Sequence, residues 1–130
     1  MNSEKIVKST LNISVPLNFV GAYLLAFPSS YAASLFGLPE NAPLLYSFFL
    51  SFIVLFFGLA YAWLARQHNV FQPLLFVGGF LKIGLFFIGF ILWLLGSASG
   101  EFLAVLICDL IIGTIWLWSL YLNRAKQNSV

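Results

Sequence analysis

Residues 43–65 contain no charged side chain, and this uncharged run limits more than any other feature what the chain can fold into. The run reads PLLYSFFLSFIVLFFGLAYAWLA. About 20 apolar residues are enough for a helix to cross the hydrocarbon core of a bilayer. A surface this apolar would associate in water. The run therefore predicts a membrane-spanning helix.

Three other stretches have the same character, so the predicted spans are 11–27, 43–65, 70–95 and 101–122. The first is the least hydrophobic, the third is interrupted only by Lys82, and the fourth only by Asp109 after its initial Glu101. Charged residues make up 8% of the chain, against roughly 25% in soluble domains. We predict one domain, residues 1–130, whose solvent is the lipid bilayer.

The links between the predicted spans indicate how the helices are arranged. Residues 66–69 and 96–100 are short links, which make successive helices antiparallel neighbours. The longer link contains SSYAASLFGLP and predicts a short interfacial helix at about 29–37. The predicted fold is all-α, an integral membrane four-helix bundle of antiparallel up-down hairpins.

The basic residues predict the orientation. If the chain crosses four times, one side carries Glu40 and Glu101 and no Lys or Arg. The other side carries Lys5, Lys8, Arg66, Arg124 and Lys126. Basic residues favour the cytoplasmic side. We therefore expect a multi-pass protein of the cell (inner) membrane with both termini in the cytoplasm.

Aromatic and small residues suggest how the spans are placed and packed. Tryptophans near span ends are typical of membrane interfaces, and we expect this of Trp63, Trp93, Trp116 and Trp118. Small residues inside spans let helix backbones approach closely. We interpret the following glycines as packing positions: Gly58, Gly78, Gly79, Gly84, Gly89 and Gly113.

Lys82 and Asp109 are the two charges expected inside the membrane. At 1.5 Å per residue, Lys82 lies roughly 18 Å into its span and Asp109 roughly 12 Å in from the opposite face. Each alone would cost about 2.5–3.5 kcal/mol to insert. Because a tight turn joins their helices, we predict that they face inward and contact each other, directly or through one water or ligand. A pair that only fixes helix register is the alternative.

Further polar side chains of the first two spans can join this centre: Asn18, Ser47, Ser51 and Tyr61. A few polar groups walled by Phe, Leu and Ile are the usual form of a ligand site. We predict an intramembrane polar centre of Lys82, Asp109, Asn18 and Tyr61. Its ligand would be lipophilic with a polar head, such as a quinone or a lipid. No residue is assigned a catalytic role.

Several functional classes are disfavoured by composition. No basic patch with interleaved aromatics predicts nucleic-acid binding. The single histidine, His68, lies in a link, so neither a bis-histidine haem nor another metal site is expected. Redox chemistry by a cysteine pair fails because Cys108 is alone. Small multidrug antiporters rely on a glutamate in their first span, where this chain has Asn12 and Asn18.

Four short motifs follow one another along the chain. They are GLPENAP after the first span, YAWLAR ending the second, a glycine pair before Lys82 in the third, and CDL around Asp109 in the fourth. In this order they resemble the small bacterial four-helix membrane proteins called DoxX-like. Members that give that family its name are subunits of a membrane thiosulfate:quinone oxidoreductase. The resemblance therefore implies a role close to a quinone or within a larger complex. It does not identify any catalytic residue in this chain.

Three functional hypotheses follow. The first is a binding protein for a quinone or lipid at the polar centre. The second is an accessory or assembly subunit of a larger, possibly redox, membrane complex. A homo-oligomeric small transporter is less favoured, because four helices are too few to enclose a pathway. An enzyme acting alone is also disfavoured, since acid–base chemistry would rest on two residues that neutralise each other.

Overall fold

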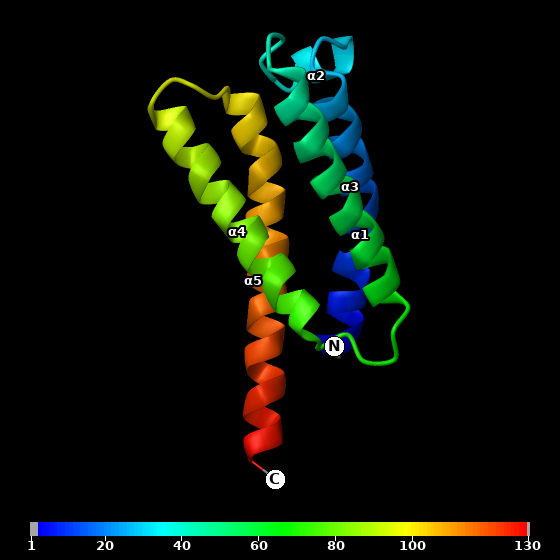
Figure 1. The fold of residues 1–130 in the computed structure, drawn as a ribbon. Coiled ribbons are helices and arrows are strands. Elements are labelled where there is room, and N and C mark those ends of the chain that lie inside the picture. Colours follow the sequence, from blue (N-terminus) through cyan, green and yellow to red (C-terminus); the bar gives the residue numbers. More distant parts are fainter. Residues whose placement is uncertain (1–2, 130) are drawn as a thin grey trace.

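The computed structural model describes residues 3–129, which contain five helices and no strand (Figure 1). The helices are α1 (Ser3–Ala26), α2 (Tyr31–Leu35), α3 (Leu44–Ala65), α4 (Pro73–Leu94) and α5 (Gly100–Asn128). All except α2 are long and apolar enough to cross a membrane. The described part of the chain is thus all-α, with four candidate membrane spans.

The four long helices pack as two pairs, α1 with α3 and α4 with α5 (Figure 1). The second pair is the predicted hairpin across 96–100. The predicted pairing of α3 with α4 is wrong, because these helices do not pack along their lengths. The link between them is longer than expected, since α4 begins only at Pro73, a residue suited to the first turn of a helix. The extra residues carry the chain from one helix pair to the other.

The two pairs are joined by an apolar cluster at the end of the molecule that carries the α3–α4 link. Figure 1 shows α4 crossing α5, with its first turns toward the beginning of α1. Residues of all four long helices, together with Val70 of the link, form this cluster: Val7, Leu11, Tyr61, Leu64, Val70, Leu75, Ile112 and Trp116. The hairpins are therefore held together chiefly at this end.

Hydrogen bonds connect α1 to α3 farther along the two helices. The side-chain amide of Asn18 donates to the carbonyl of Val54 at 3.1 Å. The hydroxyl of Ser51 donates to the carbonyl of Ala22 at 2.6 Å. Interhelical hydrogen bonds of this kind contribute about 0.6 kcal/mol on average within membranes. They help to explain why α3 packs on α1.

The short helix α2 lies within the stretch where an interfacial helix is predicted. Ser30 caps it by accepting a hydrogen bond from the backbone of Ala33 at 3.2 Å. Gly37, with φ +64°, follows its end and adopts a conformation that suits glycine. The hydroxyl of Ser99 donates to the Phe36 carbonyl at 3.4 Å and ties this turn to the start of α5.

Glycines allow the close approach of α4 and α5. A Cβ atom on Gly113 would lie 2.7 Å from the carbonyl oxygen of Gly79, closer than real side chains come. The packing interpretation is confirmed there. It is wrong for Gly84, where a Cβ would meet no atom within 4 Å.

The outward surface of the long helices is rich in large apolar side chains. On α3 these include Leu44, Leu45, Phe48, Phe49, Phe52 and Phe56, all exposed. An exterior of this kind is suited to lipid. The long helices thus carry large apolar side chains on their outer surface as well as in the buried cluster.

Candidate functional site

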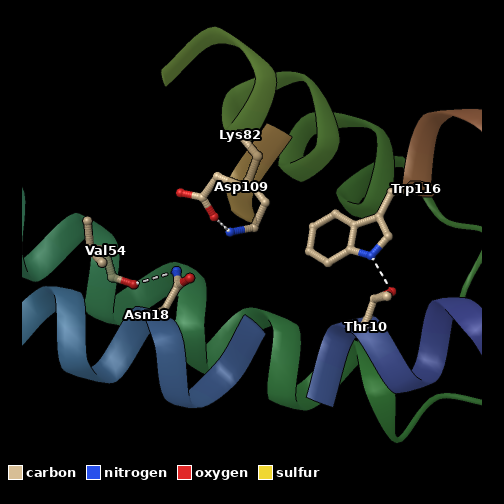
Figure 2. Close-up of polar contacts among 6 residues, drawn as sticks. All are labelled: Thr10, Asn18, Val54, Lys82, Asp109 and Trp116. Atoms are coloured by element: carbon tan, nitrogen blue, oxygen red, sulfur yellow. Dashed lines mark hydrogen bonds and ion pairs between the residues drawn. The ribbon is translucent and has the colours of Figure 1, made fainter. Parts of the chain in front are cut away.

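Lys82 of α4 and Asp109 of α5 form an ion pair between the two helices (Figure 2). Each is the tenth residue of its helix, and the helices run in opposite directions. The two helices therefore start at opposite ends of the hairpin, and each residue lies about 14 Å from the start of its own helix. The predicted contact is confirmed.

The two partners differ in their exposure. The Lys82 side chain is 4% exposed and that of Asp109 is 21% exposed. The ammonium of Lys82 donates to one carboxylate oxygen, Oδ1. Among residues 3–129, no side chain or backbone group donates to the other oxygen, Oδ2. Asp109 is therefore the accessible half of the pair.

Two aromatic rings lie beside the ammonium of Lys82. The Nζ atom lies 5.7 Å from the ring centroid of Tyr61 and 5.9 Å from that of Trp116. The two rings meet edge to face, with centroids 4.9 Å apart. Cation–π contacts contribute about 0.5–2 kcal/mol, more when the cation is desolvated. These rings stabilise the charge of Lys82 away from water.

The ring of Tyr61 fits against α4 because of Gly78. A Cβ atom there would lie 2.8 Å from Cε1 and from the hydroxyl oxygen of Tyr61. The glycine pair before Lys82 therefore has two separate roles. Gly78 makes room for Tyr61, and Gly79 lets α5 approach.

Trp116 connects this centre to α1. Its indole N–H donates to the hydroxyl of Thr10 at 2.8 Å (Figure 2). The Thr10 hydroxyl is within donating distance of the carbonyls of Ile6 and Val7, at 3.0 Å each. All four long helices thus contribute a side chain to one connected group.

The interfacial placement predicted for Trp116 is wrong, since the residue is fully buried. Trp63, Trp93 and Trp118 are exposed by contrast. The sequence did contain a signal. Trp116 follows Asp109 by seven residues, two helical turns, and so lies on the same face of α5. Thr10 offered no comparable signal.

The hydroxyl oxygens of Tyr61 and Ser14 are completely buried and have no hydrogen-bond partner in the described part of the chain. A buried polar group without a partner costs about 1–3 kcal/mol. Such groups are uncommon in folded proteins, where nearly all buried polar atoms are paired. The Tyr61 hydroxyl can therefore form a further hydrogen bond close to the ion pair.

The structure brings together three of the four predicted site residues. Lys82, Asp109 and Tyr61 form one centre, whereas the amide of Asn18 is engaged with the carbonyl of Val54 (Figure 2). No hydrogen bond or ion pair of the described residues joins Asn18 to the pair. A ligand role for Asn18 stays a prediction.

Comparison with family models, with curated proteins and with solved structures finds no match for this chain. The resemblance to DoxX-like proteins therefore rests on its four short motifs alone. What sequence and structure together identify is a small four-helix protein with four candidate membrane spans and a buried Lys82–Asp109 ion pair.

Proposed function

We propose that this protein binds the polar head of a lipophilic molecule, a quinone or a lipid, at the centre formed by Lys82, Asp109 and Tyr61. One observation carries the proposal. The unpartnered hydroxyl of Tyr61 and the free Oδ2 oxygen of Asp109 lie at the same ion pair, within the candidate membrane spans. Ionisable residues inside membrane spans commonly mark functional sites.

The difference in exposure suggests how a ligand binds. Because Asp109 is the accessible partner, the first contact is a hydrogen-bond donor of the ligand on Oδ2. A quinol hydroxyl or a lipid hydroxyl has this chemistry. The hydroxyl of Tyr61 can then bond a second polar atom of the same head group. The two rings and the carboxylate hold the ammonium of Lys82 in place beside Asp109.

A purely structural role accounts less well for these groups. A buried ion pair is weak evidence for stability, because desolvation opposes the attraction of the charges. The hydroxyl of Tyr61 does nothing for stability, since phenylalanine would fill the same space without an unpartnered polar atom. A bound ligand would supply hydrogen-bond partners to both the Tyr61 hydroxyl and the ion pair.

An accessory role in a larger membrane complex is the second candidate. It is favoured by the exposed aromatic residues of α3, which suit a protein surface as well as lipid. The DoxX-like motifs, which imply a redox assembly, point the same way. A homo-oligomeric small transporter is the third candidate, and no observation on the described residues favours it.

We also propose the orientation with both termini in the cytoplasm, in the cell (inner) membrane. The basic residues Lys5, Lys8, Arg66, Arg124 and Lys126 support it. A cysteine placed at position 126 should resist labelling by a membrane-impermeant maleimide in intact cells, whereas one at position 40 should react. The native Cys108 is replaced by serine in both variants. Labelling at 126 alone would reverse the orientation.

Native mass spectrometry tests the proposed ligand. The protein is released from detergent after incubation with a short-chain ubiquinone, its quinol and a lipid extract. Wild type should retain one of these, and Lys82→Met and Asp109→Asn should lose it. Lys126→Met, which removes an exposed lysine of α5, is the matched control and should retain it.

The folding of each variant is followed by thermal unfolding, and Tyr61→Phe supplies a variant that keeps the ion pair intact. An unchanged ligand profile in Lys82→Met and Asp109→Asn contradicts the proposal. Mild-detergent purification separates the second candidate, because an accessory subunit should elute with a larger partner.

A further inference from the structure

A second site lies at the opposite end of the molecule from the apolar cluster. A cavity of about 290 Å³ opens between the two hairpins beside α2. It is bounded by the end of α1, the link to α3, the start of α3, and the turn between α4 and α5. Its lining includes Leu25, Ala42, Ser47, Leu50, Leu92 and Phe102. None of these residues belongs to the Lys82–Asp109 centre.

The lining suits a hydrocarbon chain. It is almost wholly apolar, and small-molecule sites begin at roughly 300 Å³. The cavity forms because the hairpins are held together at the other end of the molecule. At this end the Ser99–Phe36 hydrogen bond joins them. One acyl chain of a lipid in the same leaflet can enter between them.

Ser47 adds a polar side chain to the lining of the cavity. Ser47 is 6% exposed. Serines in membrane helices commonly bond the carbonyl four residues earlier, yet the described residues give the Ser47 hydroxyl no partner. Ser47 is the fourth residue of α3, about 5 Å from its start. We expect a hydroxyl so near the end of a membrane span to meet the glycerol-ester region of a phospholipid.

The charge beside the cavity is negative. Gly37 lines the cavity, and a Cβ atom on it would lie 3.8 Å from Oε2 of Glu101. All six Lys and Arg residues lie elsewhere along the chain. A cationic head group is attracted here and an anionic one is repelled.

We propose that this cavity holds one acyl chain of a phospholipid whose head group carries a primary ammonium. The ammonium lies at Glu101, the ester region at Ser47, and the chain between α1, α3 and the turn from α4 to α5. Phosphatidylethanolamine has this chemistry. The site is independent of the ligand proposed for Lys82 and Asp109.

Competition between head groups tests the inference. The delipidated protein in detergent is given equal amounts of dioleoyl phosphatidylethanolamine, phosphatidylcholine and phosphatidylglycerol, and retained lipid is measured by native mass spectrometry. Wild type should retain phosphatidylethanolamine over phosphatidylglycerol by about fivefold, a ratio within reach of one exposed charge pair. Glu101→Gln should bring the ratio close to one.

Three further variants separate the site from general effects. Glu40→Gln removes the same charge from the same end and should keep the preference. Ala42→Phe fills the cavity and should abolish retention of all three lipids. Ser47→Ala should reduce lipid retention without abolishing it. Lys82→Met should keep the wild-type preference for phosphatidylethanolamine over phosphatidylglycerol, which distinguishes this site from the proposed polar centre.

Four results would overturn the inference. They are equal retention of the three lipids by wild type, a preference that survives Glu101→Gln, equal losses in Glu40→Gln and Glu101→Gln, and full retention by Ala42→Phe. Glu101 is exposed, so its substitution should not disturb folding. The test therefore stands even if Ala42→Phe does not fold.

Discussion

The indole N–H of Trp116 on α5 donates to the hydroxyl of Thr10 on α1, across 106 residues of sequence. The same indole ring lies beside the ammonium of Lys82. The ion pair between α4 and α5 is thus connected through Trp116 to α1 and through the Tyr61 ring to α3. Its position depends on how the two hairpins pack against each other.

Thr10→Val should destabilise the contact between the hairpins. Valine has nearly the shape of threonine but leaves the buried N–H of Trp116 without an acceptor, which costs about 1–3 kcal/mol. Chemical unfolding in detergent, followed by tryptophan fluorescence, measures the loss. Thr114→Val is the matched control, because the Thr114 hydroxyl is exposed and bonds only to Leu110 within α5. Equal losses in the two variants would contradict the prediction.

Removing one member of the ion pair should cost more than removing both. Lys82→Met or Asp109→Leu leaves a buried charge without its partner, with an expected loss of about 3–5 kcal/mol. The double variant should recover most of that loss, because apolar groups need no partner. A double-mutant cycle on the free energy of unfolding measures the coupling. Additive losses would show that the two side chains do not stabilise each other.

Gly113→Ala should separate α4 from α5. The new methyl group would lie 2.7 Å from the Gly79 carbonyl, so the backbones must move apart. Overpacking of this kind costs about 1–3 kcal/mol. Gly84→Ala is the control in the same hairpin, where nothing lies within 4 Å, and it should be neutral or stabilising by up to about 1 kcal/mol. The midpoint of thermal unfolding distinguishes them, and a reversed order would refute the packing argument.

Tyr61→Phe should separate stability from function. The variant keeps the ring beside Lys82 and removes an unpartnered hydroxyl, so stability should be unchanged or rise by about 1 kcal/mol. Retention of the ligand proposed for the polar centre should fall, because a head-group contact is lost. Unfolding and native mass spectrometry on the same sample give both values. A marked loss of stability would mean that the hydroxyl has a structural partner.

The contact between Lys82 and Asp109 could be predicted because a charge inside a membrane has few acceptable environments. Each had to find a partner, and no other charge lay at a comparable depth. The place of Trp116 could not be predicted in the same way. Tryptophan is stable both at a membrane interface and in a protein core, so its position near a span end did not decide between them.

The pairing of the helices was also open. Apolar helices are nearly interchangeable in lipid, since lipid chains are as apolar as leucine. The short links predicted that α3 would pack on α4, yet α3 packs on α1. Small features decide the outcome, such as the hydrogen bonds from Asn18 and Ser51 and the bare backbone at Gly79 and Gly113. These act only once the helices are face to face.

The uncharged run at 43–65 and its three companions determined, without any structure, that the chain forms long apolar helices. That conclusion depends on the length and polarity of each segment alone, which are local properties. The tertiary structure decided which helices pair, that Trp116 lies beside Lys82, and that Asp109 is the more accessible partner. Those features depend on shape complementarity between segments far apart in the chain, which no single segment specifies.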